Sequence, residues 1–272
     1  MKKHLSSFRK GWQGENLARY ILSNFAFISQ PSTVADDLGS DFLCTMFEPI
    51  PDGKNIYLVP KEPFAIQIKS NRKPFDITSN IEYLKGLEIP FFVGVCNQKN
   101  QVLELYSGEY LIPFFVDKPS VQIIRIILCE SSDCRDDLYF EKNNKFTVKF
   151  PRVANIGFNL NAPRLKDAVK KLSRVCRTIS RNITRRNKGQ YIFYESLSNK
   201  IMLVANKQFI KESIDNRLGE VFFELAYVLE KSFIDTDLEK YNRILDALKY
   251  ARSSINPIPG DPLKIEIKEE NQ

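Results

Sequence analysis

The segment Phe64–Ser70 reads Phe-Ala-Ile-Gln-Ile-Lys-Ser and decides the fold that we expect for this chain. Successive side chains of a β-strand point to opposite faces of the sheet, so Ile66 and Ile68 share one face. Gln67 and Lys69 project together from the other face. The segment therefore predicts a strand whose apolar face packs against the protein interior. Its other face would present an amide and an amine, which can bind a ligand or take part in catalysis.

Helices and strands alternate around this segment. Apolar residues at helical spacing predict a helix over 12–25, and a second helix is expected over 78–86. Alternating or continuous apolar runs predict strands over 41–47, 56–59, 90–96, 102–106, 121–129 and 145–150. This order of elements predicts an α/β domain over residues 1–160.

The sequence changes character after residue 160. Asn161 and Pro163 are typical of a helix start and Gly189 of a stop, so one long helix is expected over 163–186. Strands over 190–195 and 201–205 and helices over 211–233 and 238–252 would follow, giving a helix-rich region over 161–255. The proline-rich and charged tail, 256–272, is expected to be disordered.

Composition excludes several classes of protein. The 272 residues are 43% hydrophobic, which is enough to bury a core, and no apolar run approaches the roughly 20 residues of a membrane span. No signal-peptide pattern opens the chain, so we expect a cytoplasmic protein without a membrane partner, with its five cysteines as free thiols. His4 is the single histidine, which excludes the Ser-His-Asp and Cys-His nucleophile systems.

The net charge of +7 comes from one segment. Between Arg164 and Lys188 there are ten basic residues and one acid, Asp167, whereas the rest of the chain has 30 basic and 32 acidic residues. At helical spacing the basic side chains form a stripe opposite an apolar face. The stripe includes Lys170, Arg174, Arg177, Arg181, Arg185 and Lys188.

Three interpretations of this basic stripe differ in their partner. It can be an ordinary solvated face, a membrane-surface helix, or a surface that binds a polyanion. No acidic residue at i+4 neutralises the stripe, and the apolar face lacks the aromatic residues common in interfacial helices. We therefore expect the stripe to follow a nucleic-acid backbone.

A set of oxygen donors is a candidate metal site. Glu15 lies at the edge of the apolar arc of the first helix, and Asp41 begins a strand. Gln67 would add an amide oxygen and Ile68 a backbone carbonyl. Mg²⁺ and Mn²⁺ prefer carboxylate, carbonyl and water oxygens, so these four residues suit either ion.

The order of these motifs resembles a known family. Gly-x-x-Gly-Glu at 11–15, Asp-x-Gly-x-Asp at 37–41 and the 64–70 segment are followed by a helix and the Phe-Phe-Val-Gly-Val strand at 91–95. This arrangement, over residues 8–160, is similar to the PD-(D/E)XK nuclease superfamily, and more narrowly to its Q-x-K branch of Mrr-type enzymes and prokaryotic domains linked to defence against foreign DNA. The resemblance implies an α/β fold with a restriction-endonuclease-like mixed sheet flanked by helices.

The resemblance also implies roles for individual residues. Asp41 would be the shared metal ligand, Lys69 would orient the attacking water, and Glu15 would be the acid of the first helix. Gln67 takes the place of a second acid, which lowers the negative charge of the site by one. Each residue alone has an ordinary explanation in helix or turn chemistry, whereas their ordered combination favours a nuclease site.

The function expected from this resemblance is a Mg²⁺- or Mn²⁺-dependent endonuclease that hydrolyses DNA, in antiviral defence, as a homodimer or with a partner subunit. Two other functions stay open. One is a catalytically inactive nuclease fold that binds nucleic acid or a partner protein. The other is a basic interaction domain whose helix docks an acidic protein.

Overall fold

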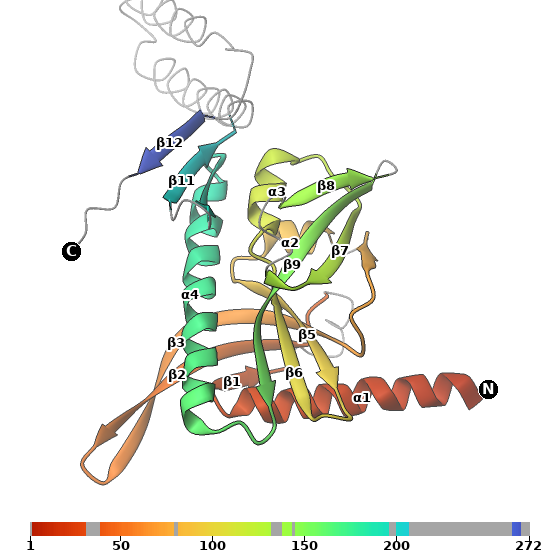
Figure 1. Cartoon of the computed structure of the whole chain (residues 1–272), viewed down its shortest axis with the longest axis vertical. Coiled ribbons are helices and arrows are strands. Elements are labelled where there is room, and N and C mark those ends of the chain that lie inside the picture. The colour runs from red at the N-terminus through yellow and green to blue at the C-terminus, as the bar shows by residue number, and fades with distance from the viewer. Residues whose placement is uncertain are drawn as a thin grey trace, which may run out of the picture. The chain divides into compact units, whose positions relative to one another are not determined.

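The computed structural model describes residues 2–30, 39–78, 81–131, 138–142, 145–195, 200–206 and 263–267 (Figure 1). The chain divides into two compact units, Met1–Thr184 and Arg185–Gln272. The first unit contains the segment from Phe64 to Ser70 and every residue of the candidate metal site.

A large mixed sheet forms the centre of the first unit. Among the described residues it has nine strands in the order β1-β2-β3-β5-β6-β9-β7-β4, with β8 paired to β9. The strands are β1 (Ala26–Ser29), β2 (Phe42–Asp52), β3 (Asn55–Lys69), β4 (Phe75–Ile77), β5 (Phe91–Asn97), β6 (Val102–Ser107), β7 (Ile124–Cys129), β8 (Tyr139–Lys142) and β9 (Lys145–Gly157). The pairs β3–β5 and β7–β9 are parallel, and the other pairs are antiparallel.

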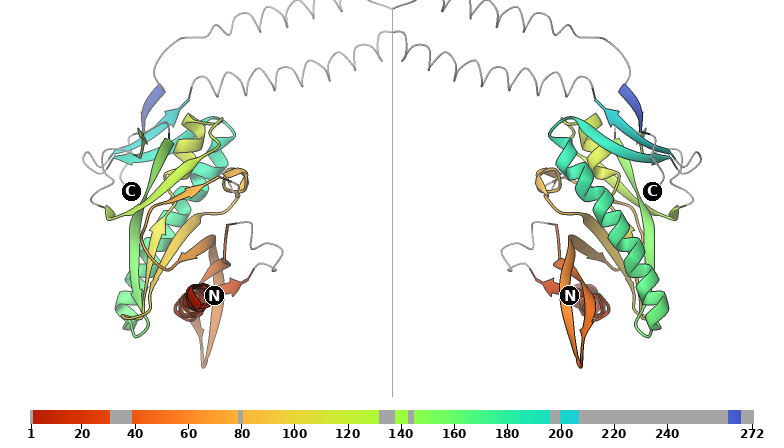
Figure 2. Two further views of the ribbon diagram at one scale, coloured as in Figure 1. Left: turned by 90° about the vertical axis from the view of Figure 1, so that its right-hand side faces the viewer. Right: turned by 90° about the vertical axis from the view of Figure 1, so that its left-hand side faces the viewer.

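Helix α1 (Lys2–Ser23) covers one face of this sheet. It contacts β1, β3, β5 and β6 and buries Ala18, Ile21 and Leu22 there. Figure 2, in which α1 is seen close to end-on, shows the helix lying against the strands. Helix α1 therefore covers the apolar face of β3, which includes Ile66. The alternation of apolar and polar residues in this strand predicts one such buried face.

The opposite face of the sheet holds a hydrophobic cluster. Ala65 and Val93 point into it from the sheet, together with residues of α2 (Ile81–Gly86), α3 (Leu111–Asp117) and β7. Phe114 at its centre is fully buried. The expected α/β fold, a mixed sheet flanked by helices, is confirmed.

The local pattern missed parts of this sheet. The two expected strands over 56–59 and 64–69 are one strand, β3, which continues through Pro60 and Pro63. These prolines lie opposite β2 at a shift in register between Thr45 and Phe47. Proline has no N–H for the ladder and is tolerated at such irregularities. The strands β1, β4 and β8 and the helix α3 have no counterpart in the sequence prediction.

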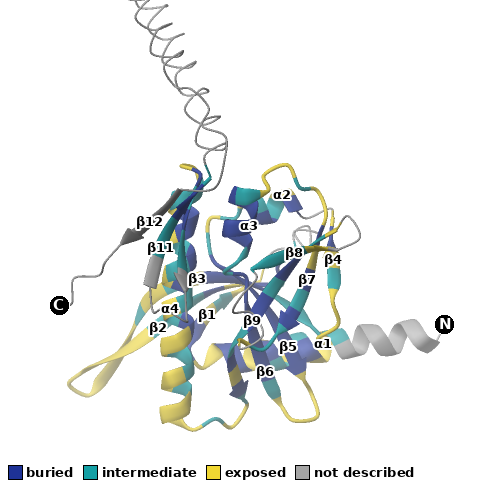
Figure 3. Ribbon diagram, turned by 45° about the horizontal axis from the view of Figure 1, so that its top comes forward, coloured by how far each residue is buried: buried dark blue, intermediate teal, exposed yellow. Residues whose placement is uncertain are grey.

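Helix α4 (Ala162–Arg186) matches the expected long helix. The Asn161 side chain accepts a hydrogen bond from the Arg164 backbone N–H at 3.2 Å, and Gly189 has a φ of 62° beyond the helix end. Leu172 and Ile179 are buried on its apolar face. Figure 3 shows exposed residues of α4 beside its buried ones, so the predicted amphipathic character is confirmed.

The second unit contains an antiparallel sheet in the order β10-β11-β12. Its strands are β10 (Gln190–Glu195), β11 (Lys200–Ala205) and β12 (Leu263–Ile267). The first two are the strands expected from the sequence, whereas β12 falls in the tail for which we expected disorder. The helices expected over 211–233 and 238–252 lie outside the described residues.

The cysteines differ from the expectation at one position. Cys44, Cys96 and Cys176 are free and buried, but Cys129 is disulfide-bonded, so the expectation of free thiols throughout is wrong for Cys129. Cys134 lies outside the described residues. Among the helices that the structure describes, none has the length and apolarity needed to cross a membrane.

Candidate active site

Asp41 is fixed beside the end of β3 by two hydrogen bonds. Its backbone N–H donates to the Ile66 carbonyl at 2.9 Å, and its Oδ2 accepts from the Ile68 N–H at 2.5 Å. Phe42, the next residue, pairs with Ile66 and lies on the α1 face. Because side chains alternate along the strand, Asp41 points to the opposite face, which is that of Gln67 and Lys69.

Lys69 is held between a carboxylate and an aromatic ring. Its ammonium lies 4.7 Å from the centroid of the Phe75 ring, a distance typical of a cation–π contact. Burial lowers the pKa of Lys69 because it disfavours the charged form, and the negative charge of Asp41 opposes part of this shift. The two predicted residues are therefore electrostatically coupled.

A cavity of about 210 Å³ opens beside Lys69. Gln67 and Lys69 line it from β3, and Phe75 and Thr78 line it from the segment that follows. Gly39, with a φ of 83°, closes it from the turn before Asp41. The buried Ser40 hydroxyl lies 2.9 Å from that of Tyr83 in α2, which ties this turn to the helix.

Glu15 approaches from the other face of the sheet. Glu15 belongs to α1, and its neighbour Gly14 lies close to Cys96 of β5. A Cβ atom added to Gly14 would lie 3.6 Å from the Cys96 Cβ. Burial raises the pKa of Cys96 to about 12, and the negative charge of Glu15 contributes to this rise. The structure thus brings Asp41, Gln67 and Lys69 to one face and places Glu15 beside the end of β5.

The oxygen donors at the end of β3 are of the chemical types that a hard divalent ion prefers. Asp41 offers a carboxylate, Gln67 an amide oxygen and Ile68 a backbone carbonyl, and Mg²⁺ and Mn²⁺ prefer all three. Within the described part of the chain, no group of three or more His, Cys, Asp or Glu side chains is arranged to hold a metal. An ion here would therefore depend on neutral oxygens and water as well as on carboxylates.

Sequence reasoning missed a polar network on the same sheet face. The Arg72 Nε donates to Glu104 Oε2 at 2.7 Å, a second guanidinium N–H donates to Oε1, and the Tyr106 hydroxyl donates to Oε2 at 2.9 Å. Arg72 also faces Glu130, and Glu130 pairs with Arg152 at 2.6 Å. The only local signal was the polar run that follows Lys69, because the partners lie on other strands.

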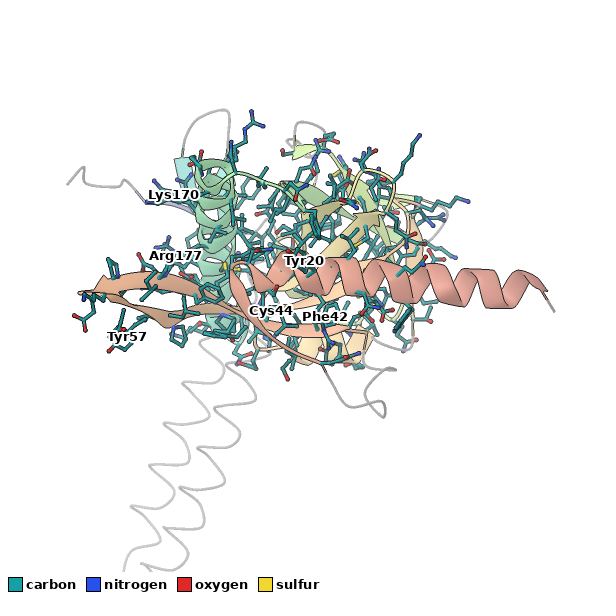
Figure 4. All side chains as sticks on the ribbon, turned by 90° about the horizontal axis from the view of Figure 1, so that it is seen from below. Tyr20, Phe42, Cys44, Tyr57, Lys170 and Arg177 are labelled. Atoms are coloured by element: carbon teal, nitrogen blue, oxygen red, sulfur yellow. The ribbon has the colours of Figure 1, made fainter. Side chains whose placement is uncertain are left out.

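The basic stripe on α4 is exposed as predicted. Lys170, Arg174, Arg177, Arg181 and Lys188 are exposed, and Arg185 is half-buried. Figure 4 shows Lys170 and Arg177 on α4 near the β2–β3 hairpin that carries Tyr57. Arg177 Nε lies 3.4 Å from a carboxylate oxygen of Glu62 on β3, so one cation of the stripe has an acidic neighbour.

No protein-family model, curated protein or solved structure matches this chain. The function of this chain is therefore inferred from its own residues. These are the Asp41, Gln67 and Lys69 side chains at the end of β3, Glu15 on α1, and the stripe on α4.

Proposed function

We propose that this protein is a metal-dependent endonuclease that hydrolyses phosphodiester bonds of DNA, in prokaryotic defence against foreign DNA. The observation that carries the proposal is that Asp41, Gln67 and Lys69 lie on one face of the sheet at the end of β3, where Gln67 and Lys69 line a cavity. They occupy the end of β3, next to a parallel strand reached through α2. The resemblance drawn from the order of the motifs supports the same function.

Asp41, Gln67 and the Ile68 carbonyl would hold Mg²⁺ or Mn²⁺, whereas Glu15, on α1 at the other face of the sheet, is not placed with them. When bound, such an ion neutralises phosphate charge and lowers the pKa of a coordinated water. The Asp41 carboxylate is oriented for this role by the Ile68 N–H. A fixed carboxylate loses little conformational entropy when it binds an ion, which favours binding.

Lys69 would act on the phosphate and the attacking water. Its partly desolvated ammonium interacts more strongly with developing phosphoryl charge than a fully hydrated one would. Phe75 and Asp41 hold it at the cavity. The stripe on α4 would contact the DNA backbone without reading its sequence.

A plasmid-nicking assay with Mg²⁺ and with Mn²⁺ tests this function. Wild type should nick supercoiled DNA, and Lys69→Ala should lose the activity. Lys73→Ala is the matched control, because Lys73 is an exposed lysine four residues along the chain. Wild type that fails to cut with either ion, or a Lys69→Ala variant that cuts like wild type, would overturn the proposal.

One observation favours a second candidate, a catalytically inactive nuclease fold that binds nucleic acid or a partner protein. Gln67 stands where a second acid is usual, and the resulting site has less negative charge to attract a divalent ion. Such a protein would bind DNA with strong salt dependence and would leave it uncut under every metal condition. DNA binding, together with no cleavage in the nicking assay with either ion, would select this function.

A further inference from the structure

A second cavity lies just beyond Lys69. Its volume is about 480 Å³, within the range of ligand pockets. Ser70, Asn71 and Arg72 line it after β3, and Asn97 and Gln98 line it at the end of β5. These are the carboxyl ends of two parallel strands, where α/β proteins commonly bind ligands.

Part of the cavity wall shares its sheet face with the candidate active site, whereas Cys96 and Gln98, beside Gly14 of α1, line it from the other side. Lys69 pairs with Val95 on β5, and Val95 pairs with Glu104 on β6. Residues paired across a sheet point to the same face, so Lys69, Val95 and Glu104 form one row. Neighbouring strands are about 4.8 Å apart, which puts the backbones of Lys69 and Glu104 about 10 Å apart. A polynucleotide strand at Lys69 would reach this cavity with an adjoining nucleotide.

Arg72 is fixed in the wall of this cavity. Glu104 accepts from two of its guanidinium nitrogens, and Glu130 lies 3.6 Å from a third. Glu104 is itself buried and held by the Tyr106 hydroxyl. The in-plane donors of Arg72 therefore have acidic partners, while 47% of its side chain stays exposed. A planar guanidinium held in this way can offer its flat face, on which nucleobases stack.

The charges and amides of the cavity suit a base better than a phosphate. Arg72 and Arg152 are balanced by Glu104 and Glu130, so this network has no positive excess to attract an anion. The carboxamides at the ends of the two strands provide both hydrogen-bond donors and acceptors. Base edges present donors and acceptors as well, whereas phosphate oxygens only accept.

We propose that this cavity binds one unstacked nucleobase of the strand whose phosphate lies at Lys69, with the base stacked on the Arg72 guanidinium. The proposal rests on the proposed nuclease function and names its substrate class. That class is single-stranded or locally opened nucleic acid next to the cleaved bond, because a base inside an intact duplex cannot enter a pocket.

The test measures binding without divalent ions, so that cleavage plays no part. An oligonucleotide with one 2-aminopurine is titrated with wild type as a single strand and as a perfect duplex. We expect tighter binding and a fluorescence change for the single strand. Arg72→Lys keeps the charge and loses the planar face, so it should weaken single-strand binding by about 5- to 150-fold, the range of one lost stacking contact. Lys73→Ala, the control, should change it little.

A second variant and a crosslinking experiment keep the proposal testable if Arg72→Lys fails to fold. Gln98→Ala leaves the Arg72 network intact and should still weaken binding of the single strand. A 4-thiothymine oligonucleotide should crosslink to wild type at 70–72 or 97–98. Crosslinks confined to α4, no preference for the single strand, or wild-type affinity in both variants would overturn the proposal. Base binding without nicking would instead refute only the nuclease function.

Discussion

The stripe on α4 allows a quantitative prediction for DNA binding. Changing Arg174, Arg177 and Arg181 to Gln removes three exposed cations and leaves the packing of Leu172 and Ile179 unchanged. Within the described part of the chain, the one ion pair of these three side chains joins Arg177, 61% exposed, to Glu62. A surface pair of this kind contributes about 0 to 1 kcal/mol. We therefore expect the free energy of unfolding to change by less than about 1 kcal/mol.

The change in binding follows from counterion release. Each phosphate contact contributes about 0.9 to the slope of log K against log salt on duplex DNA, so three contacts contribute about 2.7. Between 50 and 200 mM salt this corresponds to about 40-fold in affinity. Wild type should thus lose about 40 times more affinity than the triple variant over that range. Arg177 must leave Glu62 to contact a phosphate, so Glu62→Gln should tighten binding slightly.

Fluorescence anisotropy of a labelled duplex, titrated without divalent ions at several salt concentrations, measures these slopes. The control is Lys54→Gln, Lys73→Gln and Lys99→Gln, which removes the same charge from exposed positions outside α4. This control should keep the wild-type slope. Equal slopes for wild type and the α4 variant, or equal flattening in the control, would refute the argument. An acidic protein partner would then explain the stripe better.

Two further predictions concern the sheet face that carries the candidate site. Gln67→Glu adds a carboxylate next to Asp41, so the Mn²⁺ concentration for half-maximal nicking should fall, and an unchanged requirement would show that Gln67 is not a ligand. The Arg72 guanidinium holds the pKa of Glu104 below its usual value. The Glu104 carboxylate is therefore protonated more readily in the unfolded state than in the folded state. The pair therefore stabilises the protein above about pH 4.3 and loses its effect as the pH falls through the lowered pKa. Glu104→Gln should cost about 1 to 3 kcal/mol at pH 7 and progressively less as the pH falls below about 4.3, measured by urea unfolding. A cost independent of pH would contradict this explanation.

The sequence by itself determined the helices and strands whose hydrophobic periodicity and end signals all lie within one continuous segment. Alternation in the Phe64–Ser70 segment placed Gln67 and Lys69 on one face, which their shared cavity confirms. The spacing of apolar residues and the Asn161 cap gave α4 and its exposed stripe. These features depend on contacts between residues a few positions apart, so a single segment contains the information.

Only the tertiary structure decided what meets across strands. The continuation of β3 through Pro60 became possible because β2 shifts register opposite it, and nothing in the 55–69 segment states this. Arg72 and Glu104 are 32 positions apart in sequence, and they meet because the sheet places β3 and β6 on either side of β5. Glu15 lies on the α1 face because α1 packs against that face of the sheet. Strand order and register are set by the burial of whole faces, a property of the assembled sheet that no single stretch of sequence contains.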